Sequence, residues 1–172
     1  MVKAKGYSIW LIPAGEVYQK LSEIISKLSE KYSAPNFEPH VTLIGDLLGV
    51  EEEIISKTSE LANLLKPFEI NLKKADYLDE YFKCLFIRAE KTKEIIEANN
   101  ITRETFDQKS NPEYLPHLSL MYGNFSPEIK EKVLTNLGKQ FNISFEVKSV
   151  HLFSTTGEVK DWHKIKEFLL KP

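Results

Sequence analysis

Apolar and polar positions follow two different periods along the chain, which predicts a mixture of helices and strands. Helical spacing of apolar residues predicts helices over residues 16–32, 51–65, 91–106 and 127–141. Short apolar or alternating runs predict strands over residues 7–12, 40–44, 68–72, 82–89, 117–122 and 143–153. Helices and strands are therefore interleaved along the whole chain.

Three segments are less regular. The pair Asn99-Asn100 is a candidate break in the third helix, and the polar residues 107–115 are typical of a loop. Residues 162–170 suit either a helix or a final strand. Ser126 is placed to cap the fourth helix, because proline and glutamate follow it.

The order of elements in the first half of the chain is similar to the order in the second half. This predicts an α+β fold with two lobes, in which two antiparallel-rich sheets face a central cleft and the helices lie outside. No linker-like segment separates the lobes, so we expect residues 1–172 to form a single bilobal domain.

A short motif occurs twice, about half of the chain apart. Residues 39–44 read Pro-His-Val-Thr-Leu-Ile, and residues 116–121 read Pro-His-Leu-Ser-Leu-Met. Each copy has a proline, a histidine, an aliphatic residue, a hydroxyl residue and a leucine in the same order. Packing requirements alone rarely repeat such a pattern, so we interpret the repeat as functional.

The strand assignment predicts where the motif side chains point. Residues i and i+2 of a strand share a face, so His40 lies beside Thr42 and His117 beside Ser119. The aliphatic residues between them point to the opposite face, toward the helices. If the lobes are related by a pseudo-twofold axis, two imidazoles and two hydroxyls surround one space.

This set of groups suits the cleavage of a strained cyclic phosphodiester. One neutral imidazole can take a proton from water, and one imidazolium can protonate the leaving oxygen. Both forms of histidine are accessible near neutral pH. The hydroxyls of Thr42 and Ser119 can donate hydrogen bonds to phosphoryl oxygens. The symmetry of the two motifs leaves open which histidine is the base and which ester bond breaks.

Other kinds of site are less well supported. A catalytic zinc usually has three protein ligands, whereas the motifs offer two histidines and no adjacent carboxylate, so we expect no metal. His151 and His163 lie elsewhere without ligand spacing. Neither hydroxyl follows a glycine-flanked nucleophile pattern, and the seven glycines form no phosphate-binding loop, so we expect no cofactor.

Composition is that of an ordinary globular protein, with 42% hydrophobic and 28% charged residues and a net charge of −2. This charge gives little support for binding long nucleic acids. The one cysteine, Cys84, is expected to be buried in the core. No stretch suits a signal peptide or a membrane span, so we expect a cytoplasmic protein, a monomer, with no membrane partner.

The chain resembles the two-histidine (2H) phosphoesterase superfamily, whose mark is a pair of His-x-Thr/Ser motifs on a bilobal fold. Within it, the cyclic phosphodiesterase branch of plants and fungi is similar in three further segments. These are residues 7–13, residues 82–84, and the continuation of the second motif through Tyr122 and Gly123. The first motif runs into Ile44-Gly45-Asp46, which departs from the RNA-ligase-like branch.

The resemblance implies roles for seven residues. His40 and His117 would be the general acid and base, and Thr42 and Ser119 would hold the phosphate. Trp10, Phe82 and Tyr122 would line the pocket and contact the phosphate or the base. Core packing is an equal explanation for Trp10 and Phe82, whereas Tyr122 leaves the motif strand where its hydroxyl can reach a phosphate.

The leading hypothesis is therefore metal-independent hydrolysis of a nucleoside 2',3'-cyclic phosphate, or a related ribose cyclic phosphate, to a phosphomonoester. The expected partner is a small cyclic-phosphate nucleotide. One alternative is processing of the 2',3'-cyclic ends of RNA. Another is a non-catalytic module that binds a nucleotide or RNA. Intact histidines argue against the last, because a binding module needs no acid-base pair.

Overall fold

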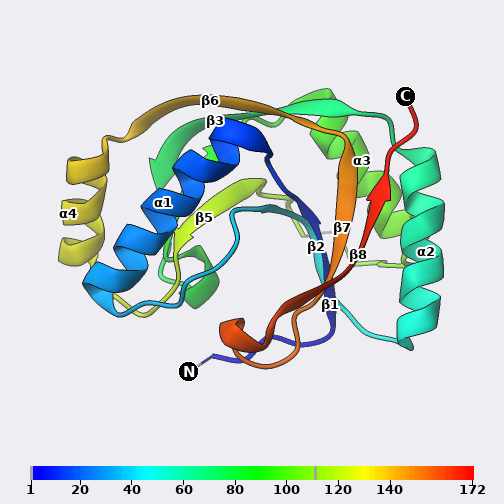
Figure 1. The fold of residues 1–172 in the computed structure, drawn as a ribbon, viewed down its shortest axis with the longest axis horizontal. Helices are drawn as coiled ribbons and strands as arrows, with labels where there is room; N and C mark the ends of the chain where they lie inside the picture. The colour runs from blue at the N-terminus through cyan, green and yellow to red at the C-terminus, as the bar shows by residue number, and fades with distance from the viewer. Residues whose placement is uncertain (1, 111) are drawn as a thin grey trace.

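A computed structural model describes residues 2–110 and 112–172 as one strongly curved sheet with helices against its outer surface (Figure 1). The strands are β1 (Tyr7–Leu11), β2 (Val41–Leu47), β3 (Phe68–Asp76), β4 (Leu85–Ala89), β5 (His117–Met121), β6 (Gln140–Val147), β7 (Ser149–Ser154) and β8 (His163–Leu169). The helices are α1 (Gly15–Tyr32), α2 (Glu51–Leu64), α3 (Lys93–Thr105) and α4 (Pro127–Leu137), with short 3-10 turns η1 (Tyr81–Lys83) and η2 (Val159–Asp161).

The strand order β6-β3-β4-β5-β2-β1-β7-β8 places the two motif strands side by side at the centre. All neighbouring strands are antiparallel, and Val41 of β2 pairs with Leu118 of β5 where the two halves meet. The predicted α+β fold with two lobes is confirmed. The two predicted sheets are four-stranded halves that this central pair joins into one.

The halves are related by a pseudo-twofold axis between β2 and β5. In this relation β1 corresponds to β4, β7 to β3 and β8 to β6. The four aliphatic residues of the motifs are at most 1% exposed: Val41, Leu43, Leu118 and Leu120. As predicted, they face the helices, which leaves the polar motif residues on the concave side.

Two of the four helices pack against the opposite half of the sheet. Helix α1 connects β1 to β2 but packs against β5 and β6 of the other half, and α3 connects β4 to β5 but packs against β2 as well as β3 (Figure 1). Burial of an apolar helix face is a main source of stability for such helices. Each half of the sheet therefore depends on a helix that the other half contributes.

Some predicted boundaries were wrong. The predicted strand over residues 143–153 is two strands, β6 and β7, which Lys148 separates and which lie in different halves of the sheet. The alternation of apolar and polar residues continues through both strands, so the pattern did not indicate where the chain crosses from one half of the sheet to the other. The predicted fourth helix extended to residue 141, but it ends at Leu137 because Gly138 adopts a positive φ of 85°.

Other local predictions have mixed outcomes. Ser126 caps α4 by accepting a hydrogen bond from the Ile129 amide. Asn99 does not break α3, and its side-chain amide donates to the Leu43 carbonyl at 2.9 Å. Residues 82–84 precede β4 and do not belong to it, since Phe82 and Lys83 lie in η1. The tail forms strand β8, and Cys84 is buried.

No helix among the described residues is both long enough and apolar enough to cross a membrane.

Candidate active site

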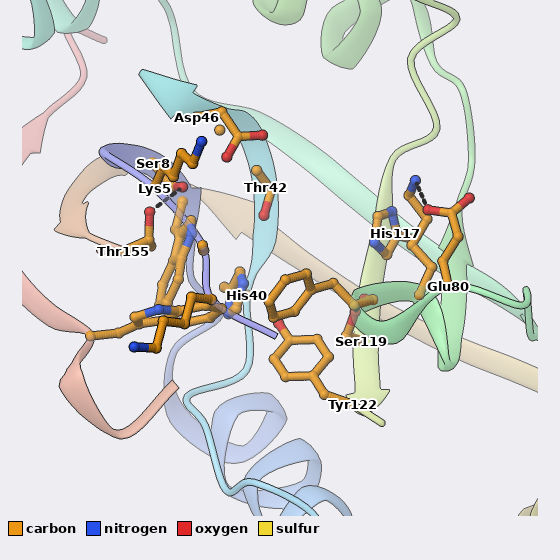
Figure 2. A pocket seen from close by; sticks show the side chains of 17 residues that line it. Lys5, Ser8, His40, Thr42, Asp46, Glu80, His117, Ser119, Tyr122 and Thr155 are labelled. Atoms are coloured by element: carbon orange, nitrogen blue, oxygen red, sulfur yellow. Dashed lines mark hydrogen bonds and ion pairs between the residues drawn. The ribbon is translucent and has the colours of Figure 1, made fainter. Parts of the chain in front are cut away.

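A cleft of about 620 Å³ lies on the concave side of the sheet, where the two halves meet (Figure 2). It brings together all seven residues that the sequence singled out: Trp10, His40, Thr42, Phe82, His117, Ser119 and Tyr122. Both halves contribute to its walls, because β1 and β2 belong to one and η1 and β5 to the other.

The two histidines are oriented in the same way by the backbone. The Nδ1 atom of His40 lies 2.6 Å from the Glu38 carbonyl oxygen, and Nδ1 of His117 lies 2.7 Å from that of Leu115. A carbonyl oxygen only accepts, so each Nδ1 carries the proton and donates it. In the neutral rings Nε2 therefore keeps its lone pair, and it is the nitrogen available for proton transfer.

His40 is held between aromatic rings. The Trp10 ring stacks on it with centroids 3.5 Å apart and planes within 6°. Only 5% of His40 is exposed. This burial lowers the pKa of His40 from 6.5 to about 3, and His117 lowers it further by charge repulsion, although the hydrogen bond to Glu38 opposes the shift.

Trp10 has no free face for a ligand. Phe153 also stacks on it, with centroids 3.9 Å apart, and two rings at such distances must occupy opposite faces of the indole. Trp10 is therefore part of the wall that fixes the His40 ring. Trp10 lines the cleft, but both faces of its ring are covered, so a nucleobase cannot stack on it.

His117 occupies a less enclosed position. Its ring meets the edge of Phe86, with centroids 5.1 Å apart. Burial lowers the pKa of His117, and the charges of Lys83 and Arg88 lower it further, while its hydrogen bond to Leu115 opposes the shift. The two histidines share one orientation but differ in their surroundings.

Phe86 is the counterpart of Trp10 in the second half. Trp10 pairs with Thr42 across β1 and β2, and Phe86 pairs with Ser119 across β4 and β5. Residues paired in this way share a face of the sheet. Phe86 could not be singled out from the sequence, because a phenylalanine in an apolar strand carries no signal that separates it from the core.

The hydroxyl groups of the two motifs are in different states. Thr42 lines the cleft, and its backbone carbonyl accepts from the Tyr114 hydroxyl at 2.9 Å. The Ser119 hydroxyl donates to the Phe82 carbonyl at 3.1 Å, and the buried Tyr122 hydroxyl lies beside it. Ser119 must therefore turn away from Phe82 before it can donate to a ligand.

The η1 turn is fastened to the second motif. Besides the bond from Ser119, the Gly123 amide donates to the Tyr81 carbonyl at 3.0 Å. The buried Lys130 side chain donates to the Leu78 carbonyl at 2.9 Å, just before the turn. These bonds hold the half-buried Phe82 ring at the edge of the cleft.

Trp162 is a cleft residue that the sequence analysis missed. It follows η2 between β7 and β8, and its ring centroid lies 5.9 Å from Trp10, 5.7 Å from Phe82 and 6.0 Å from Tyr122. It thus connects aromatic residues of both halves. Trp162 reaches the cleft because β7 and β8 form a hairpin. The pattern of residues 162–170 suited either a helix or a strand, so the sequence did not indicate this position.

Among the residues that the structure describes, no group of three or more histidine, cysteine, aspartate or glutamate side chains converges to hold a metal ion.

A bilobal α+β fold in which two His-x-Thr/Ser motifs face one cleft defines a two-histidine phosphoesterase. The family of cyclic phosphodiesterase-like proteins matches residues 5–170, and the chain belongs to this family. Family membership confirms both the predicted resemblance and the predicted class of enzyme.

The chain is similar over its whole length to a protein named cyclic phosphodiesterase from Arabidopsis thaliana. The two are 26% identical, over 99% of this chain and 98% of that protein. It is 27% identical to a 2',3'-cyclic-nucleotide 3'-phosphodiesterase from Yarrowia lipolytica, over 78% of this chain and 65% of that protein.

Solved structures share the fold. TT0787 of Thermus thermophilus superposes with a TM-score of 0.69 at 16% identity, over 96% of this chain and 97% of that one. Escherichia coli LigT in complex with 3'-AMP superposes with a TM-score of 0.64 at 16% identity, over 99% of this chain and all of LigT.

The tautomer and charge of His40 can be measured in the free protein. Nitrogen-15 NMR should show a neutral ring with a protonated Nδ1 from pH 5 to pH 8, because the pKa is about 3 and the Glu38 carbonyl holds the proton. A His40 ring that is charged at pH 6, or that carries its proton on Nε2, would contradict this geometry.

Proposed function

We propose that the protein hydrolyses a nucleoside 2',3'-cyclic phosphate, or a related ribose cyclic phosphate, to a phosphomonoester. The observation that carries the proposal is the matched pair of Nε2 atoms, each made available by a carbonyl bond to Nδ1, in one cleft with two hydroxyls. The names of the relatives from Arabidopsis and Yarrowia support the same substrate class.

The reaction needs one proton taken and one proton given. Nε2 of one neutral histidine takes a proton from water, and the water oxygen forms a bond to phosphorus. The bond between phosphorus and the ribose 2' or 3' oxygen breaks, and that oxygen receives a proton from Nε2 of the other histidine. The net change is the addition of one water and the opening of the ring.

Two hydroxyls are placed to bind the phosphoryl oxygens. Thr42 faces the cleft already, and Ser119 reaches a phosphate once it leaves the Phe82 carbonyl. Hydrogen bonds to oxygens that gain charge in the transition state accelerate the reaction more than they strengthen substrate binding. Tyr122 adds a phenol next to Ser119, and burial raises its pKa, so it acts as a neutral donor.

The base of the substrate needs an exposed aromatic face. Trp10 is enclosed between His40 and Phe153, and Tyr122 is 3% exposed. Phe82 and Trp162 line the cleft and are only half-buried. We therefore assign base stacking to Phe82 and Trp162, and positioning of the His40 ring to Trp10.

Removing either histidine should abolish most turnover. We expect His40→Ala and His117→Ala each to lower kcat for adenosine 2',3'-cyclic phosphate by about 10²- to 10⁴-fold. The double variant should be about as active as either single variant, because the effects of removing an acid and a base that act in one step do not add. His163→Ala, an exposed histidine outside the cleft, is the control and should keep full activity. Full activity of the double variant would refute the proposal.

The pH dependence follows from the lowered pKa values. Both rings are neutral in the free protein at pH 7, yet turnover needs one protonated ring. As the pH rises, kcat/KM should therefore begin to fall on the acid side of 6.5. The substrate phosphate stabilises an imidazolium, so in the complex the pKa rises and kcat should fall only at higher pH.

Initial rates between pH 4 and pH 9 at saturating and limiting substrate measure both profiles. The proposal fails here if the alkaline limb of kcat/KM lies at the same pH as that of kcat, or above it.

A further inference from the structure

The rim of the cleft beside β1 carries two lysines that the reaction does not use. Lys3 and Lys5 both line the cleft, and both are exposed. None of the ion pairs in the described part of the chain involves either of them. Lys83, on the opposite wall, is in contrast paired with Glu80 at 2.8 Å.

This rim has a fixed backbone. The Ala4 amide donates to the Gly157 carbonyl at 3.0 Å, and the Gly157 amide donates back to Ala4 at 3.2 Å. The Gly6 amide donates to the Thr156 hydroxyl at 3.1 Å. The segment that carries Lys3 and Lys5 is thus paired with the connection between β7 and β8, and the two lysines are held at the edge of the cleft.

A polar path leads from the catalytic groups to this rim. Ser8 is two residues before Trp10 on β1, and its hydroxyl lies 3.1 Å from that of Thr155. A Cβ atom at Gly45 would lie 3.4 Å from the Ser8 hydroxyl and 3.8 Å from the Thr42 methyl, so glycine keeps the floor between them open. Figure 2 shows Lys5 beside Ser8, on the side of the cleft where Asp46 and Thr155 lie and away from Tyr122.

The polar path lies on the side of the cleft away from Tyr122 (Figure 2). Phe82 and Trp162, the proposed stacking residues, belong to the aromatic group around Tyr122. If a nucleotide is held at its cyclic phosphate and its base is stacked on the side of Tyr122, its 5' oxygen can point along the polar path. Cations at the end of a polar path suit an anionic group attached there.

We propose that Lys5, assisted by Lys3, forms a subsite for a second phosphate that the substrate carries at its 5' position. This inference rests on the proposed hydrolysis of a 2',3'-cyclic phosphate and makes its substrate class narrower. The phosphate is either a terminal 5'-phosphate or the phosphodiester that connects a preceding nucleotide, and lysine recognises the same phosphoryl oxygens in both.

Asp46 places a negative charge beside this subsite, so its substitution should have the opposite effect to that of Lys5. Its carboxylate lines the same rim, with a backbone φ of 54°, and it is not among the groups within ion-pair distance of Lys5. A carboxylate there repels a phosphate, so Asp46→Asn should strengthen the subsite. Asparagine tolerates the left-handed conformation as aspartate does, which keeps the backbone unchanged.

The experiment compares kcat/KM for adenosine 2',3'-cyclic phosphate with kcat/KM for the same compound carrying a 5'-phosphate. The unchanged protein should prefer the 5'-phosphorylated compound by about three- to tenfold at low salt. Lys5→Gln should bring the ratio close to one, and Asp46→Asn should increase it. Raising the ionic strength from about 0.02 to about 0.3 M should reduce the preference, because exposed charges are screened.

The matched control is Lys27→Gln, which removes an exposed lysine from α1 outside the cleft and should leave both rates unchanged. Thermal melting of each variant shows that it is folded. A third substrate, the dinucleotide ApA with a 2',3'-cyclic end, separates the two sources of the phosphate. The gain is the increase in kcat/KM over adenosine 2',3'-cyclic phosphate. A larger gain for the 5'-phosphorylated mononucleotide assigns the subsite to a terminal phosphate, and an equal or larger gain for ApA assigns it to RNA ends.

The failures of the two proposals are distinct. If the unchanged protein does not hydrolyse adenosine 2',3'-cyclic phosphate or its derivatives, the proposed function is wrong. If it does so with equal kcat/KM for all three substrates, or if Lys5→Gln keeps the preference, the second-phosphate subsite is wrong and the proposed function stands.

Discussion

A hydrogen bond from Nδ1 of each cleft histidine to the carbonyl two residues before it is the interaction on which the rest of the site depends. It connects Glu38 with His40 and Leu115 with His117, in each case through the chain that leads into a motif strand. Because the carbonyl only accepts, one bond fixes the tautomer and the direction of the ring together. The sheet then needs only to bring two such strands together, which the central pair of Val41 and Leu118 does.

The symmetry of the backbone is not matched by the surroundings of the rings. Trp10 covers a face of His40, whereas Phe86 meets His117 by its edge. Burial is the main cause at both positions and lowers both pKa values, that of His40 to about 3. The repeat thus supplies two imidazoles with the same orientation, and the aromatic residues packed around them give the two rings different surroundings.

Much of the site could be predicted from the sequence because it depends on local rules. The alternation within a strand places His40 with Thr42 and His117 with Ser119 on one face, and the repeat indicates that the faces meet. What could not be predicted depends on long-range pairing. Trp162 and Lys5 reach the cleft through the contact between residues 4 and 157, and Phe86 reaches the His117 ring through its register with Ser119. The alternating pattern of β6 and β7 similarly conceals the point where the chain crosses between the halves.

We propose that the two carbonyl-oriented histidines act as acid and base on one cyclic phosphate. Phosphorus-31 NMR of adenosine 2',3'-cyclic phosphate, incubated with protein that has been exhaustively treated with a chelator, tests it most directly. Turnover should persist without added metal and yield one phosphomonoester isomer, because fixed rings protonate only one of the two ribose oxygens. No turnover, turnover restored only by a divalent cation, or a mixture of the 2'- and 3'-phosphates would contradict it.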